Sequence, residues 1–218
     1  MTMTGEMPVK PRLRGWLHAG ALPATLVAGL VLVALGPTLE ARLASAIYAF
    51  TSALLFGISA TYHRGTLSPR IADVLRRLDH ANIYLIIAGT HTPFALLALD
   101  GAARVAVLVV VWAGALAGAV FRMTWLNAPR WLYTALYIAL GWTAVFALPQ
   151  LLEGAGVAAV TLVIMGGVLY SAGGVVYGLR RPDPSPRWFG YHEVFHAFTL
   201  AAYVLQYISV SLVVYSAG

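Results

Sequence analysis

Seven apolar runs dominate the sequence, and each is long enough to cross the hydrocarbon core of a bilayer as a helix. A helix rises about 1.5 Å per residue, so about 20 apolar residues span roughly 30 Å of hydrocarbon. Hydrophobic residues make up 60% of the chain and charged residues only 10%, whereas an average soluble domain holds about 25% charged residues. No water-soluble fold of 218 residues buries so much apolar surface. The expected spans are 16–36, 42–62, 79–99, 103–122, 131–149, 156–179 and 191–214.

We therefore predict an all-α fold, a polytopic membrane protein with a seven-transmembrane helix bundle. A single membrane domain covers residues 1–218 and begins with a short basic cytoplasmic tail over residues 1–15. Residues that end helices mark the joints, as in Gly36-Pro37 and the proline-rich stretch 181–186. The connections are short, because seven spans use about 140 residues. The chain has no cysteine, which excludes disulfides and thiolate metal sites.

The distribution of basic residues predicts the orientation of the bundle, because such residues concentrate in cytoplasmic loops. With a cytoplasmic N-terminus, only Arg42 and Arg104 fall outside. We therefore expect the N-terminus inside and the C-terminus outside. The run 16–36 is too long for a signal-peptide core, so we expect it to be retained as the first helix. The cytoplasmic set is Lys10, Arg12, Arg14, Arg64, Arg70, Arg76, Arg77, Arg122, Arg130, Arg180, Arg181 and Arg187.

The chain is basic, with a formal net charge of +6 and a pI of about 9.8. Such a balance can indicate a nucleic-acid partner. Here the positive charges lie between apolar runs rather than on one amphipathic face, which favours membrane topology as their explanation. We expect membrane lipid, and no nucleic acid, as the partner.

Ionisable residues are costly in a membrane, so their positions are informative. The second run ends at His63, the third begins at Asp79, and the seventh begins with His192 and His196. The predicted topology places these four side chains in one layer near the cytoplasmic face. His192 and His196 are four residues apart, so both imidazoles project from one helical face and can bind one ion.

These side chains predict a metal site. Ligation by His63, His192 and His196 would leave one position of a tetrahedral zinc ion open for water, as in catalytic zinc sites. Asp79 is expected either to bind the metal directly or to hold that water and accept its proton, since zinc lowers the pKa of bound water to about 7. Ser59, one turn before His63, is placed to donate a hydrogen bond to the water or to an oxyanion. The alternative is structural: interfacial histidines are often polar helix ends, and serine is a common small packing residue in membrane helices.

The other histidines belong to different groups. His80 follows Asp79 and projects about 100° away from it, so we do not expect it to be a co-ligand. His91 is 12 residues beyond Asp79, about 18 Å deeper, where local hydrogen bonds beside Pro93 are the simpler explanation. His18 lies at the depth of the cluster. It either supports the metal ligands, or faces the substrate, or is an ordinary interfacial residue, and the last interpretation is slightly favoured.

Residues 192–196 also spell H-E-x-x-H, a zinc-protease motif in which the glutamate is the general base. Under that hypothesis the chain is an intramembrane zinc metalloprotease, with Glu193 as base and His63 or Asp79 as third ligand. Alternatively, Glu193 is an acid near a helix N-terminus, where it interacts favourably with the helix dipole. We favour the second interpretation.

Three ordered blocks of the sequence resemble the haemolysin III proteins, bacterial relatives of the progestin and adipoQ receptors, in a superfamily that also includes alkaline ceramidases. The blocks are Ser59-x-x-x-His63, residues 78–84 (LDHANIY) continuing to 88–94 (AGTHTPF), and residues 189–196 (FGYHEVFH). His18-Ala19-Gly20 is also similar to a His-Gly element of the first helix in that family.

The resemblance implies a seven-helix bundle in the bacterial cytoplasmic membrane. It further implies a zinc ion held by the residues that match His63, His192 and His196, with Asp79 reaching the metal through water. The position of Glu193 need not be acidic in that family, which argues against the protease hypothesis.

Three functional hypotheses follow. The open metal position beside a carboxylate predicts a zinc-dependent membrane hydrolase, and the resemblance implies a ceramidase-like substrate, with an amide or ester bond in a lipid. The second is a receptor-like or membrane-homeostasis protein whose zinc is structural. The third, suggested by the family's name, is a pore-forming haemolysin. It is disfavoured because we expect no helix to carry a continuous polar stripe that could line a water-filled channel.

Overall fold

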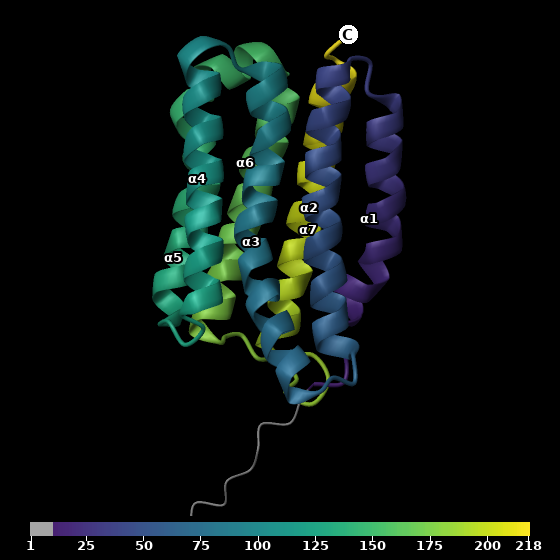
Figure 1. Cartoon of the computed structure of the whole chain (residues 1–218), viewed down its shortest axis with the longest axis vertical. Helices are drawn as coiled ribbons and strands as arrows, with labels where there is room; N and C mark the ends of the chain where they lie inside the picture. The colour runs from purple at the N-terminus through teal and green to yellow at the C-terminus, as the bar shows by residue number, and fades with distance from the viewer. Residues whose placement is uncertain (1–10) are drawn as a thin grey trace, which may run out of the picture.

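The computed structural model describes residues 11–218, in which helices run roughly along the long axis of a bundle (Figure 1). The all-α fold class is confirmed, since the elements of this part of the chain are all helical. Residues 1–10, which include Lys10 and most of the expected basic tail, lie outside the described residues. The elements are α1 (Trp16–Leu35), α2 (Leu39–Arg64), α3 (Pro69–Ala98), α4 (Gly101–Thr124), α5 (Arg130–Gly141), the short 3₁₀ helix η1 (Thr143–Ala147), α6 (Leu148–Leu179) and α7 (Tyr191–Tyr215).

Within the described residues, six helical stretches are long and apolar enough to cross a membrane. One of them, Arg130–Leu179, is 50 residues long, more than twice what the hydrocarbon core requires. It is interrupted at Gly156, whose φ of 79° is a left-handed conformation that favours glycine. The stretch folds back so that α5 lies against α6, with Ile138 packed beside Gly174. It therefore accounts for two of the seven expected spans.

The start of α3 differs most from the expected span. The apolar run was expected to begin at Asp79, whereas the helix begins at Pro69, where proline is well tolerated in the first helical turn. The added turns expose Ile71 and Val74. Hydropathy identifies where an apolar run begins, but a helix continues through polar residues for as long as its backbone hydrogen bonds are satisfied.

The outside of the bundle is apolar and its interior holds small and polar residues. Leu30 and Val109 on the outer faces are 71% and 60% exposed, while Ser45 and Ser52 of α2 are fully buried. Small side chains let membrane helices approach closely. α7 contacts α1, α2, α3 and α6, and Figure 1 shows it behind α2 and α3. The N-terminal end of α7 therefore meets the C-terminal end of α2 and the N-terminal part of α3 at one end of the bundle.

The close contact between α2 and α3 predicts a different response at two helical glycines. A Cβ at Gly89 would lie only 2.9 Å from the Cβ of Thr51, whereas a Cβ at Gly20 would meet nothing within 4 Å. We expect Gly89→Ala to lower the free energy of unfolding by about 1–3 kcal/mol, because Thr51 is β-branched and cannot easily move aside. Gly20→Ala should leave the melting temperature of the purified protein unchanged or raise it, and an equal fall in both variants would contradict this packing.

Candidate metal centre

Three buried histidines meet at one end of the bundle. His63 lies in the last turn of α2, and His192 and His196 lie in the first turns of α7. One ring nitrogen from each lies within 4.8 Å of the others, and the Nε2 atoms of His63 and His192 are 3.2 Å apart. Two nitrogens bound to one tetrahedral zinc at about 2.0–2.1 Å lie roughly 3.3 Å apart. The donor set and its spacing can therefore hold a metal ion.

The surrounding chain fixes the positions of these rings. Gly15, with a φ of 80°, lies so close to α2 that a Cβ there would be 2.5 Å from the Cβ of His63. α7 begins just after Gly190, and the spacing of four residues directs His192 and His196 to one face, with ring centroids 4.5 Å apart. The expected convergence of α2 and α7 is thus present in the structure, while the roles of these residues stay predictions.

Asp79 lies beside the three imidazoles. Its Oδ2 atom is 3.7 Å from Nε2 of His63, and its side chain is 13% exposed. That separation is too long for a direct hydrogen bond. It leaves Asp79 adjacent to the cluster, where a water molecule can bridge the carboxylate to a neighbouring group.

His18 belongs to the same cluster, so its interpretation as an ordinary interfacial residue is wrong. It is 2% exposed, its Nδ1 atom is 2.8 Å from Oγ of Ser59, and its ring stacks on His196 with centroids 3.8 Å apart. Ser59 is itself 1% exposed. The hydrogen bond pairs the Ser59 hydroxyl and one ring nitrogen of His18 within the bundle. It also places the Ser59 hydroxyl beside the metal-binding face, as expected from its position one turn before His63.

Glu193 does not belong to the cluster. Its Oε2 atom accepts a hydrogen bond of 2.8 Å from the backbone N–H of Gly190, and its Oε1 atom is paired with Arg14. The side chain is 1% exposed. Both carboxylate oxygens are thus engaged at the N-terminus of α7, which supports the helix-terminus interpretation. Glu193 is therefore not free to act as the general base that the protease hypothesis requires.

The remaining two histidines lie outside the three-imidazole group, as expected. Nδ1 of His80 is 2.7 Å from the carbonyl oxygen of Arg76 and its Nε2 is 3.1 Å from the hydroxyl of Tyr177. Nδ1 of His91 is 2.8 Å from the carbonyl oxygen of Ile87, in agreement with the expected local hydrogen bonding.

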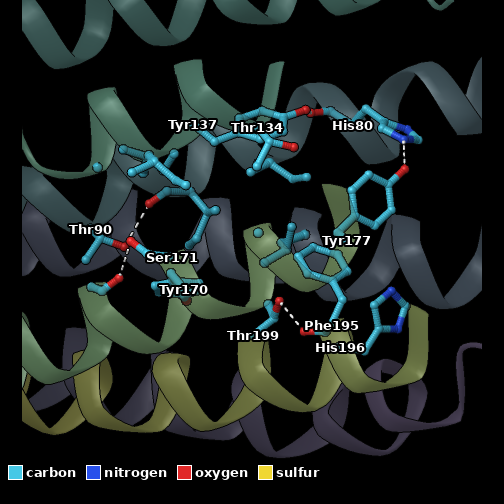
Figure 2. Close-up of a pocket in the computed structure, with 18 of the residues that line it drawn as sticks. His80, Thr90, Thr134, Tyr137, Tyr170, Ser171, Tyr177, Phe195, His196 and Thr199 are labelled. Carbon is cyan, nitrogen blue, oxygen red and sulfur yellow. Dashed lines mark hydrogen bonds between the residues drawn. The ribbon is translucent and has the colours of Figure 1, made fainter. Parts of the chain in front are cut away.

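A cavity of about 130 Å³ extends from the cluster between α3, α5, α6 and α7. Asp79, His192 and His196 form part of its wall at one end, and apolar side chains such as Ile83 and Phe195 form much of the rest. Figure 2 shows this pocket, with the hydrogen bond between His80 and Tyr177 at the same end as His196.

The inner face of α7 is more polar than expected from hydropathy. His192, His196, Thr199, Tyr203 and Gln206 recur at intervals of three or four residues and are all buried. These residues form a buried polar stripe along α7, while the expectation that no helix carries a continuous stripe lining a water-filled channel stays a prediction. Mostly apolar residues separate these positions in the sequence, so the average hydropathy of the helix conceals the stripe. Much of it is closely packed: the Tyr203 ring stacks with Tyr48 at a centroid distance of 6.0 Å.

The family model described as "Haemolysin-III related" matches residues 7–207. The chain belongs to the haemolysin III family. It is 33% identical over 159 residues to the "Hemolysin-3 homolog" of Bacillus subtilis (strain 168), which covers 73% of this chain and 72% of the relative. It is 30% identical over 171 residues to the "Hemolysin-3" of Bacillus cereus, covering 77% of this chain and 75% of the relative. The chain is thus a multi-pass membrane protein with bacterial relatives, and the resemblance seen in its sequence blocks is confirmed.

We expect this haemolysin III protein to purify with one transition-metal ion per chain. The double variant His192→Ala, His196→Ala should contain none, because a single remaining imidazole cannot hold the ion. Elemental analysis of the protein in detergent measures the content directly. His91→Ala serves as a matched control, since His91 is also a buried helical histidine but lies outside the cluster. Undiminished metal in the double variant would exclude this site.

The Arg14–Glu193 pair makes a second prediction. Glu193→Gln keeps a side chain that can accept the bond from Gly190 but removes the charge that faces Arg14. We expect it to lower the free energy of unfolding by about 1–3 kcal/mol and to leave metal content unchanged. Arg14→Gln should lower the free energy of unfolding by a similar amount. The double variant should lower it by less than the sum of the two single losses. Additive losses would show that the pair does not contribute to stability.

Proposed function

We propose that this protein is a zinc-dependent hydrolase of the bacterial cytoplasmic membrane, and that it cleaves an amide or ester bond of a membrane lipid. The observation that carries the proposal is the position of three buried imidazoles and a carboxylate at one end of a largely apolar cavity. The donors that a hydrolytic metal requires are thus adjacent to a space suited to an acyl chain.

The donor set favours zinc among the available metals. Imidazole binds zinc, copper, iron and nickel, and three histidines with a vacant fourth position are typical of catalytic zinc. His63, His192 and His196 would hold the ion. When bound, zinc supplies Lewis acidity and lowers the pKa of a coordinated water to about 7.

The side chains around the donors have separate tasks. Asp79, 3.7 Å from His63 Nε2, is close enough to orient the attacking water through a hydrogen bond and to accept its proton. Ser59 donates a hydrogen bond to the oxygen on which negative charge develops. His18 is a positioning residue: it holds the Ser59 hydroxyl at 2.8 Å and packs flat against His196, which restricts the rotation of both.

The cavity suits a lipid better than a soluble substrate. Isoleucine, phenylalanine and glycine residues of α3, α5, α6 and α7 form much of its wall, and a largely apolar wall favours hydrocarbon over a strongly polar substrate. An acyl chain in the cavity brings the carbonyl at its head to the polar end. The resemblance to the haemolysin III proteins, whose superfamily includes alkaline ceramidases, supports an amide-linked lipid as the first substrate to assay.

Asp79→Asn separates the chemistry from the metal. We expect the variant to retain wild-type metal content and to lose at least about 100-fold in the rate of fatty-acid release from ceramides or acyl lipids, because the carboxamide cannot accept the proton. The matched control is Asp73→Asn, because Asp73 is an exposed aspartate on the same helix. Absence of turnover by metal-loaded wild type across these lipids would refute the proposal.

A structural metal is the second candidate, because the three imidazoles come from α2 and α7 and a bound ion would tie those helices together. Under this alternative the protein is receptor-like or acts in membrane homeostasis. Chelation would then lower the melting temperature, while no lipid would be turned over by the metal-loaded protein.

A further inference from the structure

The cavity at the metal centre adjoins a second cavity of about 50 Å³. The two cavities share a set of lining residues, here called the waist. The waist lies about 15 Å from the three histidines, because Gln206 is ten residues beyond His196 on α7, at about 1.5 Å per residue. In Figure 2, Thr90 of the waist lies at the opposite end of the pocket from His196. The residues that line both cavities are Thr90, His91, Gly141, Trp142, Gly167 and Gln206.

Gln206, a residue of the waist, has an unpaired polar atom in its side chain. The side chain is 6% exposed, and its Nε2 donates a hydrogen bond of 3.2 Å to the carbonyl of Val163. This bond identifies the other amide atom as the oxygen, and Oε1 has no hydrogen-bond partner among residues 11–218. Gly166 leaves space for the amide, since a Cβ there would lie 2.7 Å from Nε2. A buried acceptor left unpaired is unfavourable, so a ligand with a donor at the waist would be favoured.

The other polar groups of the waist already have partners. Thr90 donates its hydroxyl to the carbonyl of Ile86, Trp142 donates its indole N–H to Ser171, and His91 contacts the carbonyl of Ile87. The acceptor that awaits a partner is therefore Oε1 of Gln206.

The second cavity continues beyond the waist with apolar walls that include Phe94, Leu151 and Val160. A ligand that fills both cavities thus meets a polar end, a mainly apolar stretch that also holds the hydroxyls of Thr134 and Tyr170, unpaired among residues 11–218, the acceptor of Gln206 and a further apolar stretch. An unsubstituted hydrocarbon chain leaves the acceptor unpaired. A chain with a hydroxyl group near its middle satisfies it and still places apolar carbon on both sides.

We propose that the waist is a binding site for a hydroxyl group in the middle of an acyl chain, with Oε1 of Gln206 as the acceptor. This inference rests on the proposed function in that the polar head of the same chain faces the metal centre. It narrows the substrate class to lipids whose acyl chain is hydroxylated far from the head.

Oleic acid and ricinoleic acid test the inference, because they differ by one mid-chain hydroxyl and both are products of lipid amide or ester hydrolysis. Each is used to displace radiolabelled oleic acid from the metal-loaded protein in nanodiscs. We expect ricinoleic acid to bind about tenfold more tightly, as one buried hydrogen bond predicts. Its methyl ether, which has no donor, should lose that advantage on the unmodified protein.

The variant Gln206→Leu should remove the tenfold preference by weakening ricinoleic acid while oleic acid binds as before. Ser209→Ala is the matched control: it removes a buried polar group one turn away on α7 that donates to Ala159 and lines neither cavity. If Gln206→Leu still prefers ricinoleic acid to oleic acid, the assignment of Gln206 as the acceptor is overturned. If that variant does not fold, the methyl ether of ricinoleic acid tests the assignment on the unmodified protein, and a methyl ether that binds as tightly as ricinoleic acid overturns it. Equal binding of the two acids overturns the inference and leaves the proposed function standing, whereas binding of neither overturns both.

Discussion

Burial of polar side chains inside a bundle surrounded by lipid is the constraint on which the rest of this structure depends. Neither the apolar outer face nor the packed interior offers such groups a substitute for water, so each needs a partner or a ligand. His63, His192 and His196 gather at one end of the molecule in a group that can hold a metal ion, and Nδ1 of His18 pairs with Ser59. The same requirement explains why Glu193 is paired with Arg14 and with the start of α7.

The depth of these residues could be predicted from the sequence because each apolar run spans a known thickness. Successive runs reverse direction, so the end of the second and the start of the seventh fall in one layer, and a spacing of four residues directs His192 and His196 to one face. The structure brings these residues together with Asp79 alongside. Orientation relative to the cytoplasm stays a prediction, since it depends on Arg and Lys residues in the loops rather than on packing.

Rotation of each helix about its own axis could not be predicted in the same way. Hydropathy defines depth but does not say which side of a helix faces a neighbour. His18 was therefore assigned to the interface, although its partners Ser59 and His196 are 41 and 178 positions away in the sequence. The stripe on α7 that includes Gln206 was hidden for the same reason. The H-E-x-x-H pattern likewise could not show that Glu193 faces Arg14, because adjacent helical residues project about 100° apart.

Recognition of one lipid among many must come from the polar atoms of such a cavity. A hydrocarbon chain that leaves the bilayer for an apolar protein cavity exchanges one apolar environment for another, so its burial contributes little to affinity and nothing to selectivity. Hydrogen bonds differ, because a buried acceptor rejects a ligand that cannot pair with it. Under the proposed function, the end of the cavity with the three histidines would select the head of the lipid, and the unpaired carbonyl of Gln206 would select along its chain. Selectivity would then depend on two polar points joined by an apolar wall.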